Sequence, residues 1–270
     1  MKRSVALIAL ALAGCANVQP ARTGGIVSTN PCSDQLLVAL APDRIAAISH
    51  YSQEAGSTSI PLPVAMRYRA TAGTAEEVIA LRPDLVVASS FEPKATIEAY
   101  KRAGLKVLTL DSPTTIAASK AQIRSLAAVL GRVDAGERLV ARIERAVAGA
   151  APRDTRRPSA LLYISDNFAN GGSSLLAEML TRAGFRDASP DFGLAFSGNV
   201  PIESVVMHPP AILLDPDPWG RTALLRRRVL GKAGYRVAEA RFPRELINCG
   251  GPTIARAMRA LAGIRARMAS

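Results

Sequence analysis

A short helix, a proline break and an apolar strand follow one another twice in this chain. The first copy is GTAEEVIALRPDLVVASS at residues 73–90, and a fainter second copy, VPIESVVMHPPAILLD, occupies residues 200–215. Because proline cannot continue a helix, Pro83 ends the first helix, and Pro209 and Pro210 end the second. The leucine- and valine-rich runs that follow suit parallel strands covered on both faces. Two such units, roughly 130 residues apart, predict two similar α/β lobes rather than a short-period solenoid.

The first copy, together with IVSTNP at residues 26–31, also carries a family resemblance. These segments resemble the substrate-binding proteins of ABC importers for ferric siderophores, haem and vitamin B12. The resemblance covers nearly the whole chain beyond residue 24. It implies an α/β fold of two Rossmann-like lobes joined by a long interlobe helix, with the ligand cleft between the lobes.

The organisation along the chain follows from these patterns. Apolar residues near a 3.6-residue spacing predict a helix over residues 114–130. This helix is our candidate for the interlobe connection, and the alternative is a crossover helix packed within one lobe. We expect a lipoprotein signal peptide at residues 1–14, a flexible tether at 15–24, an N-terminal lobe at 25–111, connecting helices at 112–150 and a C-terminal lobe at 151–270.

The N-terminus has the features of a secretory signal. Lys2 and Arg3 precede an apolar run at residues 5–13, which is too short to cross a bilayer as a permanent helix. The sequence Leu-Ala-Gly-Cys that ends at Cys15 resembles a bacterial lipobox, in which the cysteine is lipidated and becomes the new N-terminus. We therefore expect a periplasmic protein held to a membrane by a lipid anchor. The alternative is an ordinary signal with a chance cysteine.

Basic residues outnumber acidic ones, and the formal net charge is +12 at pH 7. Such a charge favours nucleic acid, an anionic membrane surface or an anionic ligand as a partner. Export argues against nucleic acid, and we predict no nucleic-acid partner. The basic residues are scattered except for Arg226, Arg227 and Arg228, which we interpret as a solvated helix face.

Two cysteines remain if Cys15 is lipidated, and export places them in an oxidising compartment. We expect Cys32 and Cys249 to lie near the cleft, one in each lobe. A disulfide between them requires Cα atoms within about 7 Å, and it would oppose hinge opening of the lobes. We therefore favour an unbonded pair over a disulfide.

Loops at the carboxyl ends of the predicted strands are the expected ligand site, because ligands of open α/β sheets bind there. Pairs of arginine and tyrosine suit a planar or anionic chelate, since the guanidinium binds oxygen acceptors and the ring offers a face. For each residue the alternative is an ordinary place in a surface loop. The candidate ligand-binding residues are Asn30, Cys32, Tyr51, Arg67, Tyr68 and Phe91 in the first lobe and Asn167, Phe168, Trp219 and Cys249 in the second.

Scarce histidines limit metal and acid–base chemistry. The chain has only His50 and His208, and it lacks the cluster of histidine, cysteine and carboxylate that a resident transition metal needs. We interpret His50 as a loop histidine, with an axial contact to haem left open. Neither G-x-S-x-G nor a G-x-G-x-x-G after the first strand is present. We predict a binding protein without cofactor, metal or catalytic residue, the alternative being an exported, lipid-anchored α/β enzyme.

Glu76 and Glu203 occupy the same place in the two copies of the repeated unit. Proteins of the family resembled present one exposed glutamate from each lobe to arginines on the two permease subunits, and these positions match that pattern. The resemblance thus implies an ABC permease dimer with its ATPase as the partner, and a siderophore, haem or corrinoid as the cargo. The alternative is that the helix dipole favours a carboxylate in the first turn regardless of any partner. Glu77 is the competing residue in the first lobe.

Overall fold

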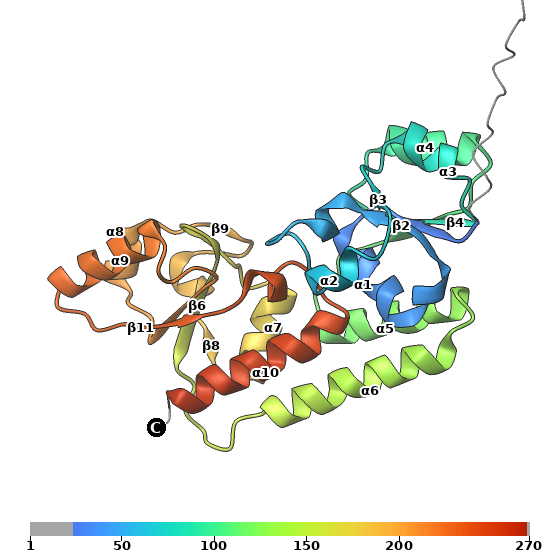
Figure 1. Ribbon diagram of the computed structural model, residues 1–270. Coiled ribbons are helices and arrows are strands. Elements are labelled where there is room, and N and C mark those ends of the chain that lie inside the picture. Colours follow the sequence, from blue (N-terminus) through green and yellow to red (C-terminus); the bar gives the residue numbers. More distant parts are fainter. Residues whose placement is uncertain (1–23, 269–270) are drawn as a thin grey trace, which may run out of the picture.

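The computed structural model describes residues 24–268, in which two β-sheets lie side by side against a layer of helices (Figure 1). The predicted signal peptide and Cys15 lie outside the described residues. Among the described helices, none combines the length and apolar character that a membrane span needs. The predicted fold class, two Rossmann-like α/β lobes, is confirmed.

The first sheet is entirely parallel, and its strands follow the order β3-β2-β1-β4-β5. The chain adds β2 and β3 on one side of β1 and then crosses over to add β4 and β5 on the other. A topological switch point therefore lies between β1 and β4, where ligands of such sheets bind. The strands are β1 (Ile26–Ser28), β2 (Ile45–Ser49), β3 (Ala70–Thr71), β4 (Leu85–Ser89) and β5 (Val107–Leu110), and the connections include α1 (Pro31–Leu40), the 3-10 turns η1 (Pro42–Arg44) and η2 (His50–Gln53), α2 (Leu62–Ala65), α3 (Ala75–Leu81) and α4 (Lys94–Arg102).

The second sheet has the order β11-β10-β6-β7-β9, with β8 also paired to β6. Its β6, β8, β10 and β11 are parallel, whereas β7 and β9 pair in the antiparallel sense. The strands are β6 (Ser159–Ser165), β7 (Phe168–Ala169), β8 (Arg186–Asp187), β9 (Gly198–Asn199), β10 (Ile212–Asp215) and β11 (Ala238–Arg241), and the connections include α7 (Leu175–Arg182), η3 (Ser189–Phe192), α8 (Ile202–Met207) and α9 (Arg221–Lys232).

The repeated unit predicted from the sequence is present in both lobes. In the first lobe α3 ends before Pro83 and β4 begins at Leu85, and in the second α8 ends before Pro209 and β10 begins at Ile212. Each strand of the unit then pairs in parallel with the strand that begins its lobe, β4 with β1 and β10 with β6. The two copies therefore occupy corresponding places in the two sheets.

The helix that connects the lobes differs from our candidate. The segment predicted at residues 114–130 forms α5 (Ile116–Val129), and the chain then turns back into α6 (Val133–Ala150), which leads to β6 of the second lobe. With 18 residues, α6 is about 27 Å long at 1.5 Å per residue, and Figure 1 shows it running beneath both lobes. Both segments have amphipathic spacing, so the sequence pattern does not distinguish which one crosses.

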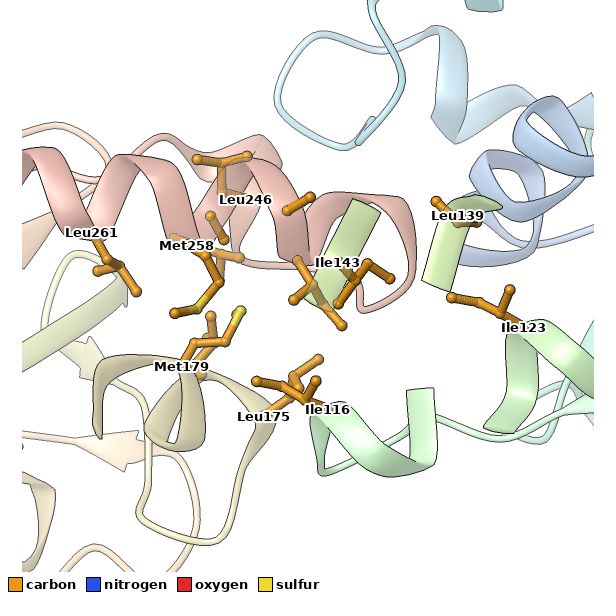
Figure 2. Close-up of a cluster of buried hydrophobic side chains, with 14 of the residues drawn as sticks. Ile116, Ile123, Leu139, Ile143, Leu175, Met179, Leu246, Met258 and Leu261 are labelled. Atoms are coloured by element: carbon orange, nitrogen blue, oxygen red, sulfur yellow. The ribbon is translucent and has the colours of Figure 1, made fainter. Parts of the chain in front are cut away.

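The last helix, α10 (Pro252–Arg267), packs along α6, and α6 also packs along α5. Their inward side chains meet those of α7, as Figure 2 shows for Ile143, Met179 and Met258. These residues belong to one apolar cluster that includes Ile26 and Val87 of the first sheet and Leu162 and Leu214 of the second. The two lobes thus share a core.

Arg226 corrects our interpretation of the arginine triplet. Consecutive residues are about 100° apart around a helix, so a triplet on a packed helix cannot face water throughout. Arg226 is 2% exposed, forms an ion pair with Asp215, and lies 4.0 Å from the centre of the Tyr163 ring. Its neighbour Arg227 forms an ion pair with Glu239 on β11. These contacts attach α9 to the second sheet.

One predicted strand is absent from the described chain. The apolar run that begins at Leu246 predicts a short strand and tight turn over residues 246–252, whereas this region holds the end of the 3-10 turn η4 (Arg244–Leu246) and an irregular segment that leads into α10. Leu246 and Ile247 are buried because they pack into the shared core rather than into a sheet. A short apolar run does not distinguish these two forms of burial.

The close approach of α5 and α6 predicts opposite effects for two glycines of α6. A Cβ on Gly136 would lie 2.6 Å from Ala127 Cβ, whereas a Cβ on Gly149 would meet nothing within 4 Å. Gly136→Ala should lower the free energy of unfolding by about 1–3 kcal/mol through overpacking. Gly149→Ala should raise it by up to about 1 kcal/mol through helix propensity. Urea unfolding measures both, and a Gly136→Ala protein as stable as Gly149→Ala would contradict this packing.

Candidate functional site

A cavity of about 160 Å³ lies between the lobes. It is bordered by the carboxyl ends of β1, β4 and β5, by the start of α7 and by the segment before α10. The lining residues are Asn30, Cys32, Ser33, Gln35, Leu36, Ser89, Leu110, Asp111, Ser112, Pro113, Gln122, Asn170, Ser174, Leu175, Leu176, Met179, Ile247, Asn248, Cys249, Gly250 and Gly251.

Asn30 and Ser89 border the cavity at the switch point of the first sheet, because they follow β1 and end β4. The Asn30 side chain also caps α1 by accepting a hydrogen bond of 2.9 Å from the backbone N–H of Cys32. Pro31 occupies the first turn, where its missing N–H leaves no helical hydrogen bond unmade. This capped turn fixes the position of Asn30 and brings Cys32 to the cavity wall.

Cys32 and Cys249 are bonded, which corrects our preference for an unbonded pair. Both line the cavity, and their Cα atoms are 5.3 Å apart in a disulfide between residues 217 positions apart in the sequence. The expectation that one lies in each lobe near the cleft agrees with their placement. The disulfide therefore links α1 of the first lobe to the segment that leads into α10.

Hydrogen bonds beside the disulfide make a second link between the lobes. The Gln35 side-chain amide donates to the carbonyl of Gly250 at 2.8 Å, and the Thr253 hydroxyl donates to the Gln35 side-chain carbonyl at 2.6 Å. Gly251 has φ of +62°, and a Cβ there would lie 2.9 Å from Leu36 Cδ2. Glycine is thus required where α10 begins against α1. We refer to Gln35, Gly250 and Thr253 together as the clasp.

The cavity wall is almost free of charge. Its polar groups are amides and hydroxyls, and Asp111 is the only ionisable side chain among the lining residues. Arginine, lysine, histidine and aromatic residues are absent from the lining. Such a wall offers hydrogen bonds to a neutral polar ligand and offers no countercharge to an anionic one.

Three of the ten predicted ligand residues line this cavity, namely Asn30, Cys32 and Cys249. The other seven lie outside it. Tyr51, Phe91 and Trp219 are 50%, 79% and 67% exposed, Arg67 and Asn167 are exposed, and Phe168 in β7 is 38% exposed. Tyr68 instead packs partly buried against a small core under the first lobe.

Sequence reasoning missed much of the cavity wall. Asp111 and Ser112 follow β5, and the carboxyl-end argument used for other strands applies to them equally. Asn170 lies in the polar loop from which we chose Asn167 and Phe168. Gln35 and Gln122 project from helices, and no local pattern in the sequence distinguishes them from other helix residues.

His50 makes local contacts. Its Nδ1 lies 3.3 Å from the carbonyl oxygen of Thr71, and its ring centre is 3.9 Å from that of Tyr51. Within residues 24–268, histidine, cysteine, aspartate and glutamate side chains form no group of three or more that suits a metal ion.

Glu76 and Glu203 are both exposed, on α3 and α8. Figure 1 shows these helices at opposite ends of the molecule. The neighbouring Glu77 is engaged within the lobe, because its carboxylate accepts hydrogen bonds from the Thr71 hydroxyl at 2.9 Å and the Ala72 N–H at 2.7 Å. The structure therefore distinguishes Glu76 from Glu77, which the sequence left as competitors.

Known proteins share this architecture. Residues 26–220 match the model of a family described as periplasmic binding protein, whereas no curated protein sequence matches the chain. The apo periplasmic heme-binding protein RhuT from Roseiflexus sp. RS-1 is 23% identical, with 92% of this chain and all of that chain covered and a TM-score of 0.74. Heme-binding HutB of Vibrio cholerae has 14% identity, coverages of 91% and 99%, and a TM-score of 0.73. Vitamin B12 binding protein BtuF of Vibrio cholerae is 16% identical, with 89% of this chain and 95% of that chain covered and a TM-score of 0.68. At these identities the structures show a common fold.

The disulfide predicts a large contribution to stability, because it closes a long loop in the unfolded chain. For a separation of 217 residues, the chain-entropy model gives about 5 kcal/mol. Replacing Cys32 and Cys249 with serine should lower the free energy of unfolding by about that amount. Reductant should lower the stability of the parent protein and leave that of the double variant unchanged. Free thiols found in unfolded, non-reduced protein carrying Cys15→Ser would contradict the bond.

Proposed function

Because the chain belongs to the periplasmic binding protein family, we propose that it captures a corrinoid such as cobalamin between its lobes and delivers it to an ABC importer. The competing ligand class is an iron complex, either a ferric siderophore or haem. Heme and vitamin B12 both appear in the names of structures with this fold, so the fold alone does not choose between them.

The neutral cavity wall is the observation that carries the choice of a corrinoid. A corrinoid ring has neutral amide side chains around its edge, and these match the amides and hydroxyls of Asn30, Ser89, Asn170 and Asn248 as donors and acceptors. Haem carries two carboxylates, and burial of a carboxylate without a countercharge is unfavourable. Asp111, the one ionisable group in the wall, would repel it further.

The size of the site also supports a ligand that extends beyond the cavity. Pockets for drug-sized ligands measure about 300–1,000 Å³, whereas this cavity is about 160 Å³. We infer that the cavity holds one edge of the ligand, and that the rest lies among the exposed loops after β2, β4 and β10. Tyr51, Phe91 and Trp219 in those loops offer aromatic faces to a flat ring.

The family also bears on the place of action and on the enzyme alternative. Its members are extracytoplasmic substrate-binding proteins, so the exported enzyme considered from the sequence loses its main support. We further propose that Cys15, outside the described residues, is lipidated and anchors the protein to a membrane. The lipobox-like sequence before Cys15 supports this.

For the importer, we propose that Glu76 and Glu203 dock the protein onto the two subunits of the permease. Their exposure, their equivalent places in the two lobes and the separation of α3 from α8 support the proposal. Paired charges of this kind mainly set orientation and encounter rate. The hydrogen bonds that Glu77 accepts from Thr71 and Ala72 favour Glu76 over Glu77 for this role.

Isothermal titration calorimetry with cyanocobalamin, hemin and the neutral chelate ferrichrome tests the ligand class. We expect cyanocobalamin to bind most tightly. Asn248→Ala should weaken it by about 0.5–1.5 kcal/mol, the range for one neutral hydrogen bond, and Asn199→Ala outside the cavity should not. Asp111→Asn should strengthen hemin binding and leave cyanocobalamin binding nearly unchanged. Tight hemin or ferrichrome binding with no cyanocobalamin binding would show that the corrinoid proposal is wrong.

Charge reversal tests the docking proposal. Glu76→Lys combined with Glu203→Lys should abolish uptake of labelled cyanocobalamin into cells and leave its affinity for the purified protein unchanged, because both residues lie far from the cavity. Glu98→Lys with Asp134→Lys makes the same change in net charge at a half-buried and an exposed carboxylate on other helices and should leave uptake intact. Normal uptake by the folded Glu76/Glu203 variant would leave only helix capping as their role.

A further inference from the structure

Asp34 is a fully buried acid that the proposed function does not yet use. It lies in the first turn of α1 and is 0% exposed. Its Oδ2 accepts hydrogen bonds from the backbone N–H of Ser49 at 3.0 Å and from the hydroxyl of Ser52 at 2.6 Å. Its Oδ1 is buried without a hydrogen-bond partner. Leaving a buried carboxylate oxygen unpaired is costly when the group is ionised.

The two partners of Oδ2 bracket the turn that carries Tyr51. Ser49 ends β2 and Ser52 lies in η2, so a single carboxylate oxygen holds both sides of the pair formed by His50 and Tyr51. This turn is one of the exposed loops to which we assign the outer part of the ligand. Asp34 therefore fixes the direction in which the turn presents the Tyr51 ring.

Ser28 connects the same acid to the cavity. Its hydroxyl donates to the carbonyl of Asn30 at 3.3 Å, and the same hydroxyl lies close enough to the Asp34 carboxylate to lower the pKa of Asp34. One hydroxyl hydrogen cannot serve both acceptors at once. An ionised Asp34 would draw the Ser28 hydroxyl hydrogen away from the Asn30 carbonyl. A protonated Asp34 would instead donate its own hydrogen from Oδ1 to the Ser28 hydroxyl oxygen, and Ser28 would keep its hydrogen bond to Asn30.

Burial raises the pKa of Asp34 to about 7, and hydrogen bonds from Ser28, Ser52 and the Ser49 N–H oppose that rise. These contributors come from β1, η2 and β2, and no charged side chain on the elements packed against α1 contributes. His50 is the titratable side chain within the bracketed turn, and it faces the carbonyl of Thr71. The change in charge thus falls near neutral pH and belongs to Asp34 itself.

We propose that Asp34 is a positioning residue that holds the two ligand-facing turns of the first lobe, at Asn30 and at Tyr51, more firmly when it is protonated than when it is ionised. The relevance to ligand capture rests on the proposed function, whereas the proton dependence of the turns does not. As pH rises, the protein would loosen these turns and present a less preorganised site.

The direction of the pH effect follows from the linkage between protonation of Asp34 and opening of the turns. A carboxyl group whose pKa is higher when the turns are closed than when they are open stabilises the closed turns. This stabilisation is complete when the pH is below the ordinary pKa of the carboxyl group, and it is lost as the pH rises through the raised pKa. With the pKa moved from 3.8 to about 7, the opening equilibrium of the turns should increase about 30-fold between about pH 5.5 and pH 8. It should change little at higher pH.

Amide hydrogen exchange of the ligand-free protein tests this directly, after correction for the intrinsic pH dependence of exchange. Protection at residues 49–52 should fall about 30-fold between about pH 5.5 and pH 8, while protection in β10 stays constant. Asp34→Asn has the same shape and keeps an acceptor oxygen, so it should give flat protection. His50→Gln should retain the parent's slope. Constant protection in the parent, or a slope that persists in Asp34→Asn and disappears in His50→Gln, would overturn the proposal.

Two further readouts keep the test decisive. Ser52→Ala removes a hydrogen bond that lowers the pKa of Asp34, so the midpoint of the change should move to higher pH even if Asp34→Asn fails to fold. An unmoved midpoint would contradict the role of Asp34. Cyanocobalamin affinity should weaken over the same pH range in the parent and stay constant in Asp34→Asn. If cyanocobalamin fails to bind at any pH, the ligand proposal fails, and the exchange result still decides the role of Asp34.

Discussion

Side chains from both sheets and from the helices beneath them pack into one continuous apolar cluster, so the lobes cannot separate without exposing it to water. Exposure of apolar surface costs about 25 cal/mol per Å². The cluster includes Ile143 of α6, Met179 of α7 and Met258 of α10, which meet between these helices (Figure 2). The disulfide and the clasp restrain the cavity wall above it. Together they set the relative placement of the lobes before any ligand arrives.

This restraint shapes how the site can work. A frame linked by a disulfide, a clasp and a shared core has little freedom for a large hinge motion, so the cavity is largely preformed. Preorganisation of this kind reduces the ordering cost of binding. The remaining freedom lies in the exposed loops after the strands, and Asp34 controls the one that carries Tyr51. Ligand selection then depends on a fixed cavity wall with a single ionisable side chain, Asp111, and on the exposed loops around it.

Features determined by neighbouring residues were predictable from the sequence. The helix, proline and strand of each repeat and the two-lobe fold follow from local patterns. Features determined by distant contacts were not. The bond between Cys32 and Cys249 depends on a 5.3 Å approach of residues 217 positions apart, and the burial of Arg226 depends on Asp215 and Tyr163. Three of the residues predicted at the carboxyl ends of strands and near the cleft line the cavity, and the others do not, because the direction of each loop depends on contacts that are distant in the sequence.

The most direct test of the account is a crystal structure of the protein with cyanocobalamin. We predict ligand density between the lobes, with one edge of the corrin ring against Asn30, Asn248 and the disulfide. We also predict that the clasp and the packing of α6 against α10 remain as they are without ligand. Density on an outer surface, or lobes swung apart with the hydrogen bond from Gln35 to Gly250 broken, would contradict a preformed interlobe site.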